Sequence, residues 1–357
     1  MEIRFLHADH LRLASSVRGI ADAPGWLKTL AAGAFRQATR NLIEQAIATR
    51  AHFVVIAGSI TDSDADLEPV VRWLDGQFDS LRNAQIPVVA WAANETHRSA
   101  LSRICSVVLT SDQRLDVCCD SLTSAGQLRF SARPMTADTR SDLTICAGQS
   151  FADRWSGNSL RYQIQPSRQH QHANRLTAGN GVLTASAGAT QAQSPDERHA
   201  CGCLLVTADT ATQSLTAKFL ETDVLRFSQQ HLSLDSAALH SGLRECVGRV
   251  LSGVGVDNER TLLVDWVVSG AGRFGGPSLH ELSEARLLRL MRNDLQSGHR
   301  GAWPRSVRYQ EDLVSVEIPS LTLAMREFLS VVRADSGTIR TRCGETWAGL
   351  ELLSRAA

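Results

Sequence analysis

Short apolar runs alternate with a long amphipathic segment in the first hundred residues. The apolar runs are residues 3–7, 53–58 and 86–91, and the middle one is uninterrupted and rich in β-branched side chains. Such a run is typical of a strand that is buried on both faces of a sheet. Between the first two runs, residues 27–50 carry apolar side chains at helical spacing. This order predicts a βαβαβ unit whose strand ends share one edge of the sheet, where open α/β sheets hold their ligands.

The later part of the chain continues this mixed α/β pattern. Weak alternation between residues 112 and 140 predicts β-hairpins, and compact apolar runs predict further strands at residues 143–148, 160–164, 203–208 and 215–221. We expect the last two of these strands to close a second sheet. After about residue 226 the pattern predicts a smaller α/β unit, with helices at residues 236–251, 278–295 and 321–332 and strands at 261–268, 307–309 and 313–318.

Composition narrows the class of protein. Acidic and basic residues number 37 each, so the chain as a whole is not steered electrostatically towards nucleic acid. No run approaches the roughly 20 apolar residues that span a bilayer, and no signal peptide opens the chain, so we expect a cytoplasmic protein without a membrane partner. The eight cysteines include the neighbours Cys118 and Cys119 and the pair Cys201 and Cys203, which lack the two-residue spacer of zinc and redox motifs. We expect them to be buried small side chains.

Three segments at the expected strand ends carry the candidate chemistry: HADHLRLAS at residues 7–15, IAGSITD at 56–62 and PVVAWAANETH at 87–97. They resemble the first three motifs of calcineurin-like metallophosphoesterases, most closely the DNA repair exonuclease branch with its SbcD-like and YhaO-like proteins. Residues 186–206, which include SAGATQ and GCLLV, resemble a non-catalytic stretch of the YhaO-like proteins.

The resemblance extends over roughly residues 1–330 and implies a particular architecture. It implies a four-layer αββα sandwich for residues 1–225 and a smaller α/β capping domain for residues 226–319. A C-terminal helical segment, residues 320–357, would follow.

The chain departs from the family at positions that would hold two metal ions. Aligned without a gap, His10 and Arg12 stand where the resemblance implies an aspartate and a histidine ligand, and Ser59 stands where it implies the aspartate that bridges both ions. A neutral serine hydroxyl is a weak ligand, whereas a two-metal centre depends on carboxylates and imidazoles. These replacements predict a large loss of metal affinity.

The third turn leaves two interpretations open. Asn94 matches a family ligand position, whereas Glu95 replaces the histidine that the resemblance places beside the leaving oxygen. Equally, Asn94 is suited to cap a helix expected at residues 95–104, because asparagine and a following acid favour a helix start.

Two further alternatives concern the remaining ligands. Moving the first motif by one residue offers Asp9 in place of His10. Counted from the downstream segment, His170 and His172 fall near the two histidines that complete the family's metal site. Counted from Tyr162, neither histidine reaches those positions, and both then belong to a polar surface loop.

These observations predict a degenerate, non-catalytic homologue of the DNA-repair exonucleases that needs no cofactor and acts as a scaffold for DNA or a protein partner. The alternative is an active phosphoesterase or nuclease that holds Mn²⁺ or Mg²⁺ in a rebuilt site made of Asp9 or His10, Asn94, His170 and His172. A third interpretation, favoured by the even charge balance, is a scaffold that has lost nucleic-acid binding as well. The resemblance implies an SMC-like coiled-coil ATPase as partner, docked at residues 321–353, and a homodimer is a further expectation.

Overall fold

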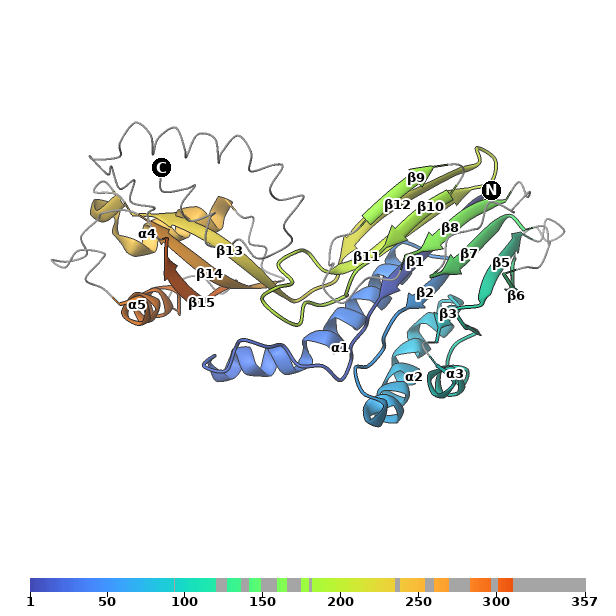
Figure 1. Ribbon diagram of the computed structural model, residues 1–357, viewed down its shortest axis with the longest axis horizontal. Coiled ribbons are helices and arrows are strands. Elements are labelled where there is room, and N and C mark those ends of the chain that lie inside the picture. The colour runs from blue at the N-terminus through green and yellow to red at the C-terminus, as the bar shows by residue number, and fades with distance from the viewer. Residues whose placement is uncertain are drawn as a thin grey trace, which may run out of the picture.

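The computed structural model describes residues 1–92, 94–119, 127–135, 141–148, 159–165, 175–179, 182–234, 238–253, 260–269, 283–296 and 301–310. Within these residues the chain is a mixed α/β protein with two six-stranded sheets and one three-stranded sheet (Figure 1). No helix in this part of the chain is both long and apolar enough to cross a membrane.

The first sheet contains the βαβαβ unit. Its order is β12-β11-β1-β2-β3-β4, with bounds Ser214–Glu221, Gly202–Asp209, Glu2–Asp9, Phe53–Ala57, Val88–Trp91 and Val107–Leu109. Strands β1 to β4 are parallel, so the carboxyl ends of β1, β2 and β3 share one edge as the sequence predicts. All five residues of β2 are buried, which explains its unbroken apolar run.

The prediction that residues 203–208 and 215–221 close the second sheet is wrong. The strands exist, but β11 pairs antiparallel with β1, placing Val206 opposite Phe5, and β12 pairs with β11. The side chains of Leu204, Val206 and Ala208 face the core between the two sheets. These side chains would face the same core if the strands belonged to the other sheet. The apolar pattern therefore predicts that they are buried but not which strand lies beside them.

The second sheet packs face to face against the first. Its order is β6-β5-β7-β8-β10-β9, with bounds Leu128–Pro134, Gln113–Cys119, Leu143–Ala147, Leu160–Ile164, Val182–Ser186 and Arg175–Gly179. In the shared core the ring of Phe5 stacks on Phe53, with centroids 4.8 Å apart, and meets Tyr162 edge-on at 5.2 Å. The core between the sheets therefore joins β1 and β2 to β8.

Three helices cover the outer face of the first sheet: α1 (Gly25–Ala48), α2 (Leu67–Asn83) and α3 (Glu95–Leu101). Two residues after the end of each of the first two helices, Arg50 and Gln85 adopt the left-handed conformation. The backbone N–H groups of Ala51 and Ile86 then donate to the carbonyl oxygens of Ala46 and Leu81. These hydrogen bonds end each helix immediately before the next strand begins. Among the described residues no helix covers the outer face of the second sheet, so the fourth layer stays a prediction.

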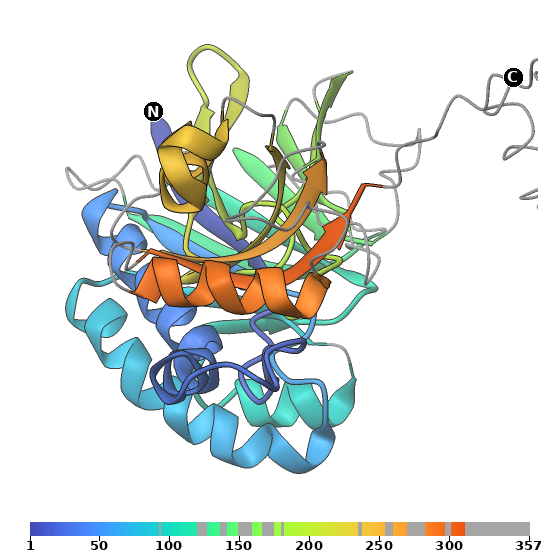
Figure 2. The same ribbon diagram turned by 90° about the vertical axis from the view of Figure 1, so that its left-hand side faces the viewer.

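The third sheet is parallel and lies beside the sandwich in Figure 1, so that it lies in front of the sandwich in the view of Figure 2. It consists of β13 (Leu225–Ser233), β14 (Thr261–Ser269) and β15 (Ala302–Tyr309), and α4 (Ala238–Gly253) and α5 (Glu284–Gln296) pack on one face. The first half of α1 packs on the other face, where Phe35 joins a cluster with Phe227 and Trp303. Sequence reasoning missed β13, whose second half alternates polar residues with few apolar ones.

Several predictions fall on residues that the structure does not describe. They are the strand at residues 313–318, the helix at 321–332 and the whole C-terminal segment 320–357. The division into domains at residues 1–225 and 226–319, and the capping role of the second, likewise stay predictions.

Candidate functional site

The loops after β1 and β2 bring the first two motifs together. The backbone N–H of His10 donates to Ala57 O (3.1 Å), and the N–H of Ser59 donates to His10 Nδ1 (3.2 Å). His10 and Arg12 both have positive φ angles, of 45° and 49°. Gly58 has φ 73° and a Cβ there would lie 2.9 Å from the His10 ring, so glycine is required for the close approach. The predicted juxtaposition of His10 and Ser59 is therefore present.

His10 has little capacity left to bind a metal ion. Because Nδ1 accepts the Ser59 N–H, a neutral ring carries its own proton on Nε2. Neither nitrogen then offers a free lone pair, and a metal would have to displace one of these protons. The Ser59 hydroxyl donates to Thr61 O, so the side chain that replaces the bridging aspartate serves its own loop.

Arg12 is half of a buried ion pair. Its Nη1 lies 2.8 Å from Glu197 Oε1, and the two side chains are only 7% and 5% exposed. The second carboxylate oxygen of Glu197 accepts the N–H of Gln193 at 2.7 Å. Breaking such a pair leaves an uncompensated buried charge, so Arg12 is held in place where the resemblance implies a ligand histidine.

Asp9 belongs to a second buried polar network, with His7 and Tyr162. Burial and the charge of Asp9 raise the pKa of Tyr162 well above its usual range, so the phenol keeps its proton. The phenol oxygen is hydrogen-bonded to His7 Nδ1 (2.7 Å), and Asp9 Oδ1 accepts a hydrogen bond from His7 Nε2 (2.9 Å). Asp9 Oδ2 accepts the N–H of Ala187 at 2.9 Å. Both carboxylate oxygens of Asp9 are therefore engaged inside the protein.

Asn94 caps helix α3. Its Oδ1 accepts the N–H of His97 at 2.8 Å, and its backbone is extended, as a residue before a helix should be. Glu95 lies in the first turn, 79% exposed, with Arg98 at 3.5 Å. The geometry is that of the cap interpretation, and an asparagine oxygen that accepts this bond has one lone pair fewer for a metal ion.

Residues 186–206, which resemble a non-catalytic stretch of the YhaO-like proteins, connect the sandwich to the third sheet. Ala187 holds Asp9, as described above, and the buried Gln191 binds the start of β13. Gln191 Nε2 donates to Leu225 O (2.6 Å), and its Oε1 accepts the N–H of Val224 (2.9 Å). This role is structural.

The predicted metal ligands do not fit a two-metal centre within the described residues. No group of three or more histidine, cysteine, aspartate or glutamate side chains in these ranges is placed to hold an ion. Asp9, His10 and Asn94 each use their ligand atoms for hydrogen bonds within the protein. His170 and His172 lie outside the described residues. No reaction step through Mn²⁺ or Mg²⁺ follows from this geometry.

Four of the described cysteines have a thiol pKa raised well above its usual range. Burial raises the pKa of Cys105, Cys146 and Cys203 to about 12, and burial together with Asp142 raises that of Cys119 to about 11. Thiolate is the reactive form, so these four thiols are poor nucleophiles at neutral pH. Cys146, Cys201 and Cys203 are buried, whereas Cys105, Cys118 and Cys119 are half-buried, so the expected burial does not hold for the neighbours Cys118 and Cys119.

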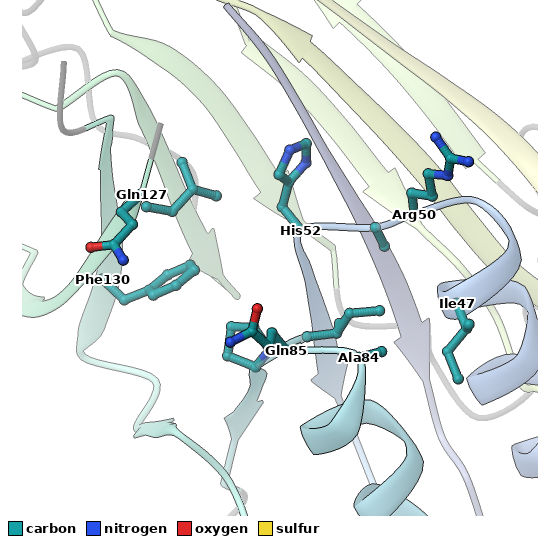
Figure 3. A pocket seen from close by; sticks show the side chains of 11 residues that line it. Ile47, Arg50, His52, Ala84, Gln85, Gln127 and Phe130 are labelled. Carbon is teal, nitrogen blue, oxygen red and sulfur yellow. The ribbon is translucent and has the colours of Figure 1, made fainter. Parts of the chain in front are cut away.

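A pocket of about 700 Å³ lies at the opposite end of the sandwich (Figure 3). Its wall combines the left-handed residues at the ends of α1 and α2, Arg50 and Gln85, with His52 at the start of β2 and Phe130 of β6. Because it adjoins the amino ends of the parallel strands, it is not the site formed by their carboxyl ends.

The sequence predicts the loops after β1 and β2 but not the residues that bind Arg12 and Asp9 there. These residues are far apart in the chain: His7 lies in β1, Tyr162 in β8 and Glu197 in the loop between β10 and β11. None of them belongs to a recognisable spacing of metal ligands. The signal that was present is Arg12 in a turn between buried strands, because a buried cation requires an acid nearby. Which acid supplies it depends on the path of residues 187–201.

No protein-family model and no curated protein matches the sequence. Among solved structures, a crystal structure of TT1561 of Thermus thermophilus is similar, with 7% identity over 61% of this chain and 99% of that chain and a TM-score of 0.32. A match at this level carries no argument about function.

Proposed function

We propose that this protein is a degenerate, non-catalytic homologue of the DNA-repair exonucleases in the metallophosphoesterase superfamily, acting as a scaffold that binds DNA or a protein partner. The Arg12–Glu197 ion pair supports the proposal most strongly, because a cation held by a buried acid stands where the resemblance implies a metal ligand. The proposal includes the four-layer sandwich and the cap.

The other replaced positions support the same conclusion. A two-metal hydrolase holds both ions and the attacking hydroxide between carboxylates and imidazoles. Here Ser59, Asp9 and Asn94 each make a side-chain hydrogen bond to the protein's own backbone. An SMC-like ATPase that docks on residues 321–353 stays a prediction, since that segment lies outside the described residues.

Hydrolysis assays test the proposal. We expect the purified protein to show no Mn²⁺-stimulated cleavage of linear DNA or of bis(p-nitrophenyl) phosphate. The variant Ser59→Asp should be equally inactive, because metal ligands act as a unit and one restored carboxylate does not rebuild the site.

Turnover by the wild-type protein that is lost in His170→Ala or His172→Ala would contradict the proposal. That result would favour the active phosphoesterase with a rebuilt site. Thermal unfolding of each variant is the control that separates lost activity from lost folding.

A further inference from the structure

A polar cluster occupies the face of the third sheet that is turned away from α4 and α5. Gln229 of β13, Asp265 of β14 and Ser306 of β15 lie opposite one another in one row of the sheet. The next row is formed by His231, Val267 and Arg308. The loop between β10 and β11 runs beside β13 (Figure 1) and adds Arg198.

The charges in this cluster are not balanced. Among the described residues of these two rows, the carboxylate is that of Asp265, which accepts from Arg305 at 2.6 Å and from the Ser306 hydroxyl at 2.5 Å and is only 9% exposed. Arg198 reaches this carboxylate only at 3.6 Å. Arg305 and Arg198 thus share one acid, and Arg308 adds a third guanidinium group whose hydrogen bond goes to Gln229.

Two of these guanidinium groups converge on a neutral atom. Arg198 Nη1 donates to Gln229 Oε1 at 2.6 Å, and Arg308 Nη2 donates to the same oxygen at 3.3 Å. The two cations are therefore no further apart than the sum of these distances. An amide oxygen carries no charge to offset their repulsion, and no carboxylate of the described residues lies within ion-pair distance of Arg308.

The cluster is open to a ligand from solvent. The Arg198 side chain is 42% exposed, and Arg308 and His231 are exposed as well. Arginine presents a planar fork of donors that matches a phosphate group, and a phosphate oxygen carries the negative charge that Gln229 lacks.

We infer that Arg198 and Arg308 form a binding site for a phosphate group on the third sheet, supplied by a nucleic-acid backbone or by a free phosphate compound. The inference rests on the proposed scaffold role, for which it supplies the ligand and the contact surface. It concerns binding alone and needs neither metal nor turnover.

The test measures binding of a fluorescein-labelled oligodeoxythymidylate to the full chain by fluorescence anisotropy, in EDTA and over a series of salt concentrations. We expect Arg198→Gln and Arg308→Gln each to weaken binding about tenfold, as for the loss of one charge-assisted hydrogen bond. The slope of log affinity against log salt should fall by about 0.7 for each lost phosphate contact.

The matched control is Arg133→Gln, which removes an exposed arginine from β6 in the second sheet. Unchanged binding by Arg198→Gln and Arg308→Gln, or an equal loss in Arg133→Gln, would overturn the inference. Titration with inorganic phosphate separates the two sources. If phosphate stabilises the wild type against unfolding but not the two variants, and the oligonucleotide does not bind, the ligand is a free phosphate compound.

Absence of both responses in the wild type would also overturn the inference. Because EDTA excludes metal-dependent cleavage, this outcome says nothing about catalysis. The hydrolysis assays judge the non-catalytic proposal separately.

Discussion

Arg12 occupies a position in the turn after β1 where the resemblance implies a metal-binding histidine. Its guanidinium is 2.8 Å from Glu197 and nearly buried, at the end of the loop that also positions His10. A histidine here would be neutral at neutral pH and free to bind a metal, whereas an arginine stays charged and must be paired. Because Arg12 is paired with Glu197, this position does not hold a metal ligand but connects the loop after β1 to the loop between β10 and β11.

We expect removal of either partner of this pair to destabilise the protein strongly. Arg12→Met or Glu197→Gln should each lower the free energy of unfolding by about 3–5 kcal/mol, because the remaining charge stays buried after losing its partner in this ion pair. The double variant Arg12→Met/Glu197→Met should lose less than the sum of the two. Urea unfolding followed by circular dichroism measures these changes.

The exposed pair Arg103–Glu68 provides the control. Its side chains are 53% and 56% exposed, so Arg103→Met should cost far less stability than Arg12→Met. If Arg12→Met costs no more than this control, the ion pair does not hold the loop and the main support for the proposed function is lost.

For the helices and strands, the apolar pattern predicted the position of an element along the chain better than it predicted which strands pair. The long apolar periodicity of α1 and the β-branched run of β2 are properties of single segments, and both elements were found from sequence within a few residues. The placement of β11 beside β1 was predicted wrongly, because a strand's inward-facing side chains fit the core between the sheets from either side. The partners of Arg12 and Asp9 were unpredictable for a related reason: Glu197 and Tyr162 reach them only through the tertiary fold.

Helix α3 offers a direct test of what Asn94 does. Asn94→Ala should lower the free energy of unfolding by about 1 kcal/mol, because the N–H of His97 loses its acceptor. Asn94→Ser, which keeps a capping oxygen, should restore most of that loss. Thermal unfolding with and without Mn²⁺ measures both effects.

A metal-binding role for Asn94 makes a different prediction. Mn²⁺ would then stabilise the wild type and fail to stabilise both variants. Equal unfolding temperatures with and without Mn²⁺ in all three proteins are the result that a cap requires.

At the scale of the whole molecule, helix α1 ties the sandwich to the third sheet. Its second half packs on the first sheet through Leu42 and Ala46, and its first half packs on the third sheet through Leu27 and Phe35. Gln191 adds buried hydrogen bonds to the start of β13. The third sheet therefore has a defined position beside the loops that carry Arg12 and Arg198, which is what a binding scaffold without catalysis would need.

We propose that the carboxyl ends of β1, β2 and β3 do not hold metal ions. The most direct measurement is a crystal of the protein soaked in MnCl₂, with the anomalous signal of manganese mapped at this edge of the sheet. We expect no manganese peak between Ser59 and Asn94, with His10 Nδ1 still accepting the Ser59 N–H and Arg12 still paired with Glu197. A manganese ion there, bound by Asp9, His10 or Asn94, would contradict it.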